Sequence, residues 1–282
     1  MTIKLCYRRD PTNKVDPKTG AIIDLRKVDR NFTTELKPHL INVTDGDIDL
    51  SPFATETNQY NLNACAGNAT ADSVEIISAV DEANLAASEG RPASPPTQLS
   101  RLFVYSMART ITDDGTGNSE LGVDDGTYIR TCFETLSDFG ICSEDMWPYD
   151  TSKVKVSPSI LALRQAAGHR IHSYYRIDAT GDSLLTEIVS ALRAQHPVVF
   201  GTEVDEAFMN FGGPELVNKP QGPTAGGHAM IIVGYVNGMF KIKNSWGKEW
   251  RDNGYCFFTP DYLTWAKSWD FWVPTTGTVF KK

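Results

Sequence analysis

The spacing of apolar residues divides the chain into a helical part and a strand-rich part. From Cys65 onward, small and apolar side chains recur at helical spacing, and Asn63 stands at the expected N-cap. The same spacing predicts two further helices before residue 140, the second ending with Gly140 in a C-cap position. The three patterns are carried by Ala66, Ala69, Ser73, Val74, Ile77 and Val80, by Leu99, Leu102, Phe103, Ser106 and Met107, and by Ile129, Cys132, Phe133, Leu136 and Phe139.

After residue 166 the pattern changes. One more helix is predicted around residues 184–192, and it leads into a strand at 197–201. Segments 228–236 and 239–244 alternate between apolar and polar residues and flank Asn237-Gly238, a strong signal for a two-residue β-hairpin. Residues 255–258 predict another strand. The chain has no internal repeat.

The first 48 residues are polar and weakly periodic and contain three prolines. They predict an amino-terminal extension, either a packing arm or a short propeptide. Within it, the brief apolar run Ile22–Arg26 is able to lie against the body of the protein. We expect a mainly helical part at residues 49–165 and a mainly β part at residues 166–282.

Composition narrows the classes of function. The net charge of −8 argues against binding to nucleic acid or to anionic membranes as a main activity. The sequence has no apolar run near 18 residues, so no membrane span is predicted, and we expect a monomer. Five cysteines are an odd number, and the amino terminus lacks the apolar stretch of a signal peptide, which predicts a reducing, cytoplasmic compartment.

Cys65, His228 and Asn244 occur in contexts that fit a thiol nucleophile, its base and the amide that orients the base. A thiol reacts well only when its pKa falls, through a helix N-terminus or a neighbouring imidazolium. Cys65 begins a predicted helix, and Asn244 can hydrogen-bond one ring nitrogen of His228. The side-chain amide of Gln59, together with the Cys65 N–H, would stabilise an oxyanion, and Trp246 would cover the His228–Asn244 bond.

These residues resemble the papain-like cysteine peptidases. Gln59 stands six residues before Cys65, His228 begins an apolar strand and a hairpin, and Asn244-Ser-Trp-Gly247 follows. Trp147-Pro148-Tyr149 is similar to the family's aromatic-Pro-Tyr element. The match covers roughly residues 49–272. Leu62 and the run Ala66–Ala69 are similar to the microbial branch of the family.

The resemblance implies an α+β, papain-like two-subdomain fold, with a helical half, an antiparallel β-barrel-like half and the active-site cleft between them. It implies cleavage of peptide bonds in a peptide or protein substrate through a Cys65 thioester, with catalytic roles for Cys65, His228, Asn244 and Gln59. No metal or organic cofactor is expected. Gly126 and Thr127 are expected to dock the substrate backbone, with Gly227 and Trp246 beside the scissile bond.

Several alternatives stay open. Taken singly, Cys65 fits a packing residue and His228 a structural histidine. The same acyl-enzyme could serve a transpeptidase or ligase, and a cleft without catalysis would give a peptide-binding module. Asp125 could cap the helix at residues 128–139. A Ca²⁺ site in the acidic loop Asp113–Glu120 is less favoured than a solvated turn, because the spacing does not follow the EF-hand pattern.

Overall fold

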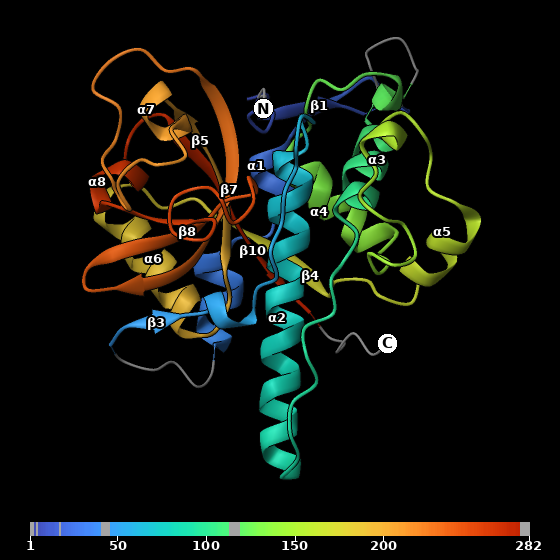
Figure 1. The fold of residues 1–282 in the computed structure, drawn as a ribbon. Coiled ribbons are helices and arrows are strands. Elements are labelled where there is room, and N and C mark those ends of the chain that lie inside the picture. The colour runs from blue at the N-terminus through green and yellow to red at the C-terminus, as the bar shows by residue number, and fades with distance from the viewer. Residues whose placement is uncertain (1–2, 4, 17, 41–45, 113–118, 277–282) are drawn as a thin grey trace.

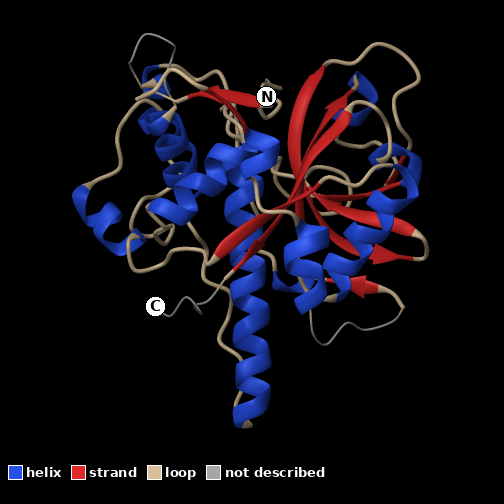
Figure 2. Cartoon of the chain, turned by 180° about the vertical axis from the view of Figure 1, so that it is seen from behind, coloured by secondary structure: helices blue, strands red, loops and turns tan. Residues whose placement is uncertain are grey.

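The protein is described from a computed structural model that covers residues 3, 5–16, 18–40, 46–112 and 119–276. Helices gather on one side of the long helix α2 and a large sheet lies on the other (Figure 1), and Figure 2 shows the same two parts from behind. The expected α+β class is confirmed. The α-helices are α1 (Leu25–Val28), α2 (Cys65–Glu89), α3 (Arg101–Ile111), α4 (Ile129–Asp138), α5 (Ile160–Ala166), α6 (Gly181–Arg193), α7 (Glu206–Met209) and α8 (Pro260–Leu263).

Eight strands of the described residues form one sheet, in the order β4-β10-β5-β7-β8-β9-β6, with β3 paired to β7. Every pairing is antiparallel except that of β6 with β9. The end strands β4 and β6 do not pair with each other, so the sheet is open rather than a closed barrel. Its strands are β3 (Ile48–Asp49), β4 (Ser173–Ile177), β5 (Val198–Val204), β6 (Leu216–Val217), β7 (Gly226–Val236), β8 (Met239–Lys243), β9 (Tyr255–Phe258) and β10 (Ser268–Thr275).

Strands β7 and β8 form the hairpin that the sequence predicts. Val236 pairs with Met239, and the two residues between them, Asn237 and Gly238, have φ values of 50° and 81°. Positive φ at both central residues is the geometry of a type I′ turn, whose twist matches that of the strands. The hairpin brings His228, near the start of β7, close to Asn244, which follows β8.

Helix α2 lies at the centre of the molecule, between the sheet and helices α3 and α4 (Figure 1). Its first three and a half turns are almost entirely buried, which explains why they are built from small residues. A side chain at Gly67 would meet the Cβ atom of Tyr105 on α3 at 2.9 Å, so glycine permits the close approach of the two helices. No helix among the described residues is long and apolar enough to cross a bilayer.

The predicted cap of α2 is wrong, and so is the alternative that Asp125 caps α4. Ala64, not Asn63, stands at the N-cap of α2, and Asn63 instead donates hydrogen bonds to Asp124 from its backbone and side chain. Helix α4 has Tyr128 at its N-cap, so Asp125 does not cap it. Gly140, with φ of 81°, closes α4 as predicted by donating to the Thr135 carbonyl.

The amino-terminal extension is more structured than its polarity indicates. It contains a two-stranded sheet, the short helix α1 and two irregular helical turns, Phe32–Leu36 and Lys37–His39. In the apolar run Ile22–Arg26, Leu25 is buried while Ile22 is exposed. The strands of the small sheet are β1 (Asn13–Val15) and β2 (Ile22–Asp24).

A buried ion network joins the two parts of the molecule. Lys243, at the end of β8, forms an ion pair with Asp72 on α2 and donates to Thr57 Oγ1 at 2.7 Å. Asp72 also binds the guanidinium of Arg101 on α3, at 2.9 Å. Arg101 in turn lies 3.3 Å from the Glu75 carboxylate. Two acids and two bases are therefore buried together, and their charges balance.

Removing one member of this network should destabilise the protein strongly. Lys243→Met leaves the buried Asp72 carboxylate with one partner fewer, a change that typically costs about 3 to 5 kcal/mol. Lys267→Met is the matched control, because Lys267 pairs with Glu203 at the surface and such pairs contribute about 1 kcal/mol or less. Urea unfolding of both variants measures the difference, and equal small losses would contradict the role assigned to the network.

Candidate active site

Cys65 is the first residue of α2, so its sulfur lies where the helix presents unpaired N–H groups. The side chain is 1% exposed. Burial raises the pKa of the Cys65 thiol to about 12, although hydrogen bonds from the backbone N–H groups of Ala229 and Ala66 act in the opposite direction. Ala229 follows His228 on β7, so the sulfur lies next to the strand that carries the imidazole.

His228 and Asn244 are directly hydrogen-bonded. His228 Nε2 lies 2.8 Å from Asn244 Oδ1, and the Ser245 N–H donates to the same oxygen at 2.8 Å. Because Asn244 Oδ1 is an acceptor fixed by Ser245, Nε2 must be the protonated nitrogen of the neutral ring. Nδ1 then carries the free lone pair, and no partner among the described residues hydrogen-bonds it. The ring is thus set up to take a proton on Nδ1.

Trp246 stacks on this pair. Its ring centroid lies 4.7 Å from that of His228, with the two planes 27° apart, and the residue is 2% exposed. Phe208 packs edge-on against Trp246 at 5.5 Å. The indole therefore keeps water from one side of the imidazole. The structure places Trp246 beneath the ring, and its contact with substrate stays a prediction.

Gln59 is buried and held at both ends of its amide. Its Oε1 accepts from Ser245 Oγ at 2.6 Å, and its Nε2 donates to the Leu62 carbonyl at 2.9 Å. Because Oε1 is fixed as the acceptor, the amide cannot flip, and its second N–H hydrogen is left for another acceptor. Ser245 was not predicted to act in the site, although it belongs to the Asn244–Gly247 motif. Its position between Asn244 and Trp246 was the signal that could have found it.

A segment of the amino-terminal extension, around Cys6 and Tyr7, lies between Gly126 and Gly227. A Cβ atom on Gly126, whose φ is 79°, would come within 1.7 Å of the Cys6 carbonyl oxygen. The Gly227 carbonyl accepts from the Tyr7 N–H at 3.1 Å. The structure thus brings both predicted docking residues together with extended backbone. Thr127, next to Gly126, is buried.

His228 is completely covered, and burial lowers its pKa to about 4. The hydrogen bond that His228 Nε2 donates to Asn244 Oδ1 acts in the opposite direction and is the smaller effect. Burial therefore favours the neutral forms of both Cys65 and His228 while the two side chains are covered.

Among the described residues, no group of three or more His, Cys, Asp or Glu side chains is arranged to hold a metal ion. Most of the acidic loop considered for Ca²⁺, residues 113–118, lies outside the described residues.

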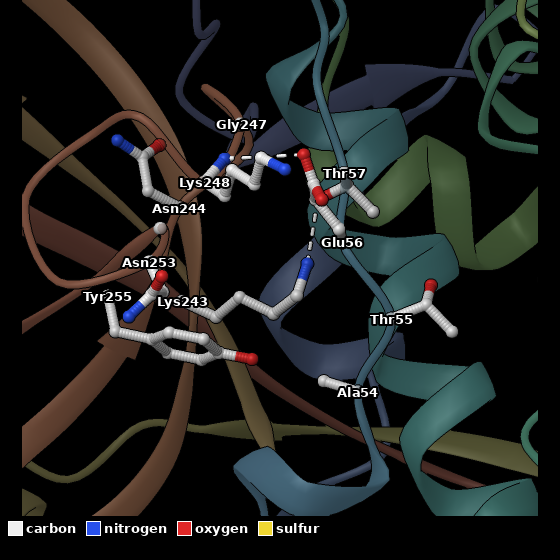
Figure 3. Close-up of a pocket in the computed structure, with 11 residues that line it drawn as sticks. Ala54, Thr55, Glu56, Thr57, Lys243, Asn244, Gly247, Lys248, Asn253 and Tyr255 are labelled. Atoms are coloured by element: carbon white, nitrogen blue, oxygen red, sulfur yellow. Dashed lines mark hydrogen bonds between the residues drawn. The ribbon is translucent and has the colours of Figure 1, made fainter.

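A pocket of about 270 Å³ is lined in part by Asn244 (Figure 3). It is formed where segment 54–57 faces the end of β8 and the loop 247–255. Lys243 reaches across it to Thr57, and the Lys248 N–H donates to Glu56 at 3.4 Å. Asn244 lines this pocket, but neither Cys65 nor His228 does, so the pocket does not contain the proposed nucleophile or base.

The comparisons with known proteins agree with this geometry. The sequence model described as papain family cysteine protease matches residues 101–263, a range that contains His228 and Asn244. An uncharacterized peptidase C1-like protein of Acanthamoeba polyphaga mimivirus is 31% identical over 280 residues, covering 93% of this chain and 84% of that protein. The chain belongs to the papain family of cysteine proteases.

Other papain-family proteins share shorter stretches or the fold. Mouse pro-cathepsin H is 31% identical over 124 residues, which cover 41% of this chain and 34% of the relative. Among solved structures, xylellain, a cysteine protease from Xylella fastidiosa, superposes with a TM-score of 0.72 at 26% identity, over 98% of each chain. The proform of the ragweed pollen cysteine protease Amb a 11 shares the fold, with a TM-score of 0.65 at 18% identity, over 90% of this chain and 73% of that one. The expected papain-like fold is confirmed.

Ser245→Ala should reveal whether the anchored Gln59 amide matters for chemistry. Losing the Ser245 Oγ bond frees the amide to rotate, and we expect kcat/KM for a peptide substrate to fall by about tenfold. The rate at which iodoacetamide alkylates Cys65 should not change, because alkylation forms no oxyanion. Ser190→Ala on the surface of α6 is the control and should change neither rate. An equal loss in both reactions of Ser245→Ala would show that Ser245 acts on Cys65 or on the fold instead.

Proposed function

We propose that this papain-family enzyme is an endopeptidase that cleaves peptide bonds through a thioester on Cys65. The observation that carries the proposal is the chain of bonds Gln59–Ser245–Asn244–His228, which ends at His228 Nδ1. The next residue on β7, Ala229, hydrogen-bonds the Cys65 sulfur through its backbone N–H. This arrangement orients a base and an amide donor around one nucleophile.

In the proposed reaction, His228 Nδ1 takes the Cys65 proton and the sulfur attacks the carbonyl carbon of the scissile bond. The carbonyl oxygen becomes an oxyanion, which the second N–H of Gln59 Nε2 and the Cys65 N–H stabilise. When the C–N bond breaks, His228 gives its proton to the leaving amine. Water, deprotonated by His228, then attacks the thioester, and the acid product leaves while Cys65 regains its proton.

The cleft supports cleavage within a chain rather than at its end. The segment that lies between Gly126 and Gly227 continues in both directions, to Leu5 on one side and Arg8 on the other. A peptide can therefore enter and leave this cleft without presenting a terminus.

We also propose a monomer, since a single chain supplies every residue of the site. A reducing compartment is supported by the odd number of cysteines, of which Cys65, Cys132, Cys142 and Cys256 are free thiols.

Cys65→Ala should abolish peptide turnover and leave the thermal unfolding temperature close to that of the unchanged chain. Cys256→Ala is the matched control: Cys256 is equally buried but lies on β9, away from His228, so turnover per folded molecule should persist. A folded Cys256→Ala variant that loses as much activity as Cys65→Ala would contradict the assignment. In the unchanged enzyme, a competing amine that traps most of the product would instead indicate a transpeptidase. A chain that binds peptide without turnover would indicate a binding module.

The rate of peptide cleavage should depend on pH as a bell. Once substrate and water enter the cleft, the burial that lowers the His228 pKa and raises that of Cys65 is relieved, and thiolate with imidazolium becomes the reactive pair. The rate should then rise with pH as the thiol ionises and fall at higher pH as the imidazolium loses its proton. A kcat/KM profile measures both limbs. A rate that rises steadily to about pH 10 would indicate an unpaired thiol instead.

A further inference from the structure

Tyr60, the residue after Gln59, has a backbone conformation that its side chain does not favour. Its φ is 51°, in the left-handed region, which glycine adopts readily and in which a bulky residue is an outlier. The Leu62 N–H donates to the Gln59 carbonyl at 3.1 Å, so Tyr60 is the first central residue of a tight turn. Turns with a positive φ at this position are dominated by glycine, asparagine and aspartate. The backbone of the turn is therefore strained at Tyr60.

Among the described residues, the other non-glycine positions with positive φ each have a local reason for it. Three carry short polar side chains that tolerate this region: Asn237, Asn253 and Asp270. Arg251 is held by hydrogen bonds from its guanidinium to three backbone carbonyl groups. Gln195 directly follows the C-cap of α6, where chains commonly adopt a left-handed residue. None of these reasons applies to Tyr60.

Packing does not offset the strain either. The Tyr60 side chain is 45% exposed, and its ring centroid lies 6.3 Å from that of Tyr149, with the planes 43° apart. Among the described residues, no hydrogen bond reaches the Tyr60 hydroxyl. A strained residue that gains little from burial is typical of a functional position.

The turn that carries Tyr60 is held firmly by its neighbours. The Gln59 N–H donates to the Ser245 carbonyl at 2.8 Å, and the Gln59 carbonyl accepts from the Tyr149 hydroxyl at 3.3 Å. The Tyr60 N–H donates to Asn58 Oδ1 at 2.8 Å. The exposed ring is thus fixed directly beside the residue whose side-chain amide is proposed to stabilise the oxyanion.

We propose that Tyr60 is a substrate-binding residue whose ring packs against the part of the peptide that follows the scissile bond. The inference rests on the proposed peptidase function and takes Gly126 and Gly227 as the dock for the residues before that bond. Asn58 pairs with Trp246 in an isolated β-bridge, so the turn is joined to the Trp246 side of the site. The residues that leave with the amine pass this side. An aromatic ring there favours apolar or aromatic residues after the bond.

The test compares two substrates with the same residues before the scissile bond. One is a peptide methyl ester, whose leaving group is methanol. The other is the same peptide extended by several residues after the bond, the first of them phenylalanine. Tyr60→Gly should lower kcat/KM about tenfold for the extended peptide and less than about twofold for the methyl ester. Tyr60→Phe keeps the ring and should restore most of the loss.

Gln195→Gly is the matched control for the release of strain. Both glycine variants act at a left-handed position, with φ of 51° at Tyr60 and 66° at Gln195, so each should raise the melting temperature by about 2 °C. Gln195 lies at the end of α6, and its replacement should change neither rate. An extended-peptide rate that does not fall in Tyr60→Gly would overturn the inference. An equal fall with both substrates would overturn it too, since that indicates a disturbed Gln59 amide.

Peptide binding separates a failure of this inference from a failure of the proposed function. The extended peptide would be titrated into Cys65→Ala with and without Tyr60→Gly, and we expect binding to weaken about tenfold in the double variant. If the unchanged chain hydrolyses neither substrate, the peptidase function is overturned and the titration decides the contact. Weaker binding by the double variant then supports the contact, and equal binding by the two chains overturns it.

Discussion

The ion pair between Lys243 and Asp72 is the constraint on which the geometry of the site depends. Asp72 lies two turns along the helix that begins with Cys65, and Lys243 is the residue immediately before Asn244. One buried interaction therefore fixes the element that carries the nucleophile against the element that carries the orienting amide. Because both charges are buried, the pair is costly to break, and this resists sliding of the two halves against each other.

Several residues of the site come directly after Lys243 in the sequence. Asn244, Ser245 and Trp246 follow one another, and each acts on a different neighbour: Asn244 and the Ser245 N–H set the His228 tautomer, the Ser245 hydroxyl fixes Gln59, and Trp246 covers the ring. A single short loop thus orients His228 and Gln59 and shields the His228 imidazole from water.

Periodicity predicted those helices and strands whose buried and exposed side chains alternate regularly along the sequence. Helices α2, α3, α4 and α6 and the β7–β8 hairpin were found because burial or turn chemistry leaves a regular signal. Strand β10 was missed, and its Asp270 has φ of 57° beside a register shift, which interrupts alternation. The cap predicted at Asn63 was wrong, because the helix begins one residue later than predicted, with Ala64 at the N-cap, and Asn63 donates instead to Asp124, far along the chain. Nothing local in Leu5–Asp10 indicates that Gly126 and Gly227 enclose it, since those contacts span more than a hundred residues.

The most direct test of the central claim is to trap the acyl group on the protein. The unchanged chain would be incubated with an activated peptide ester at pH 7, quenched in acid, and mapped by mass spectrometry. The account predicts that the acyl group is found on Cys65 as a thioester that hydroxylamine removes, and that Asn244→Ala lowers the amount formed at early times. Acylation at another residue, or none at Cys65 while the peptide ester is still consumed, would contradict it.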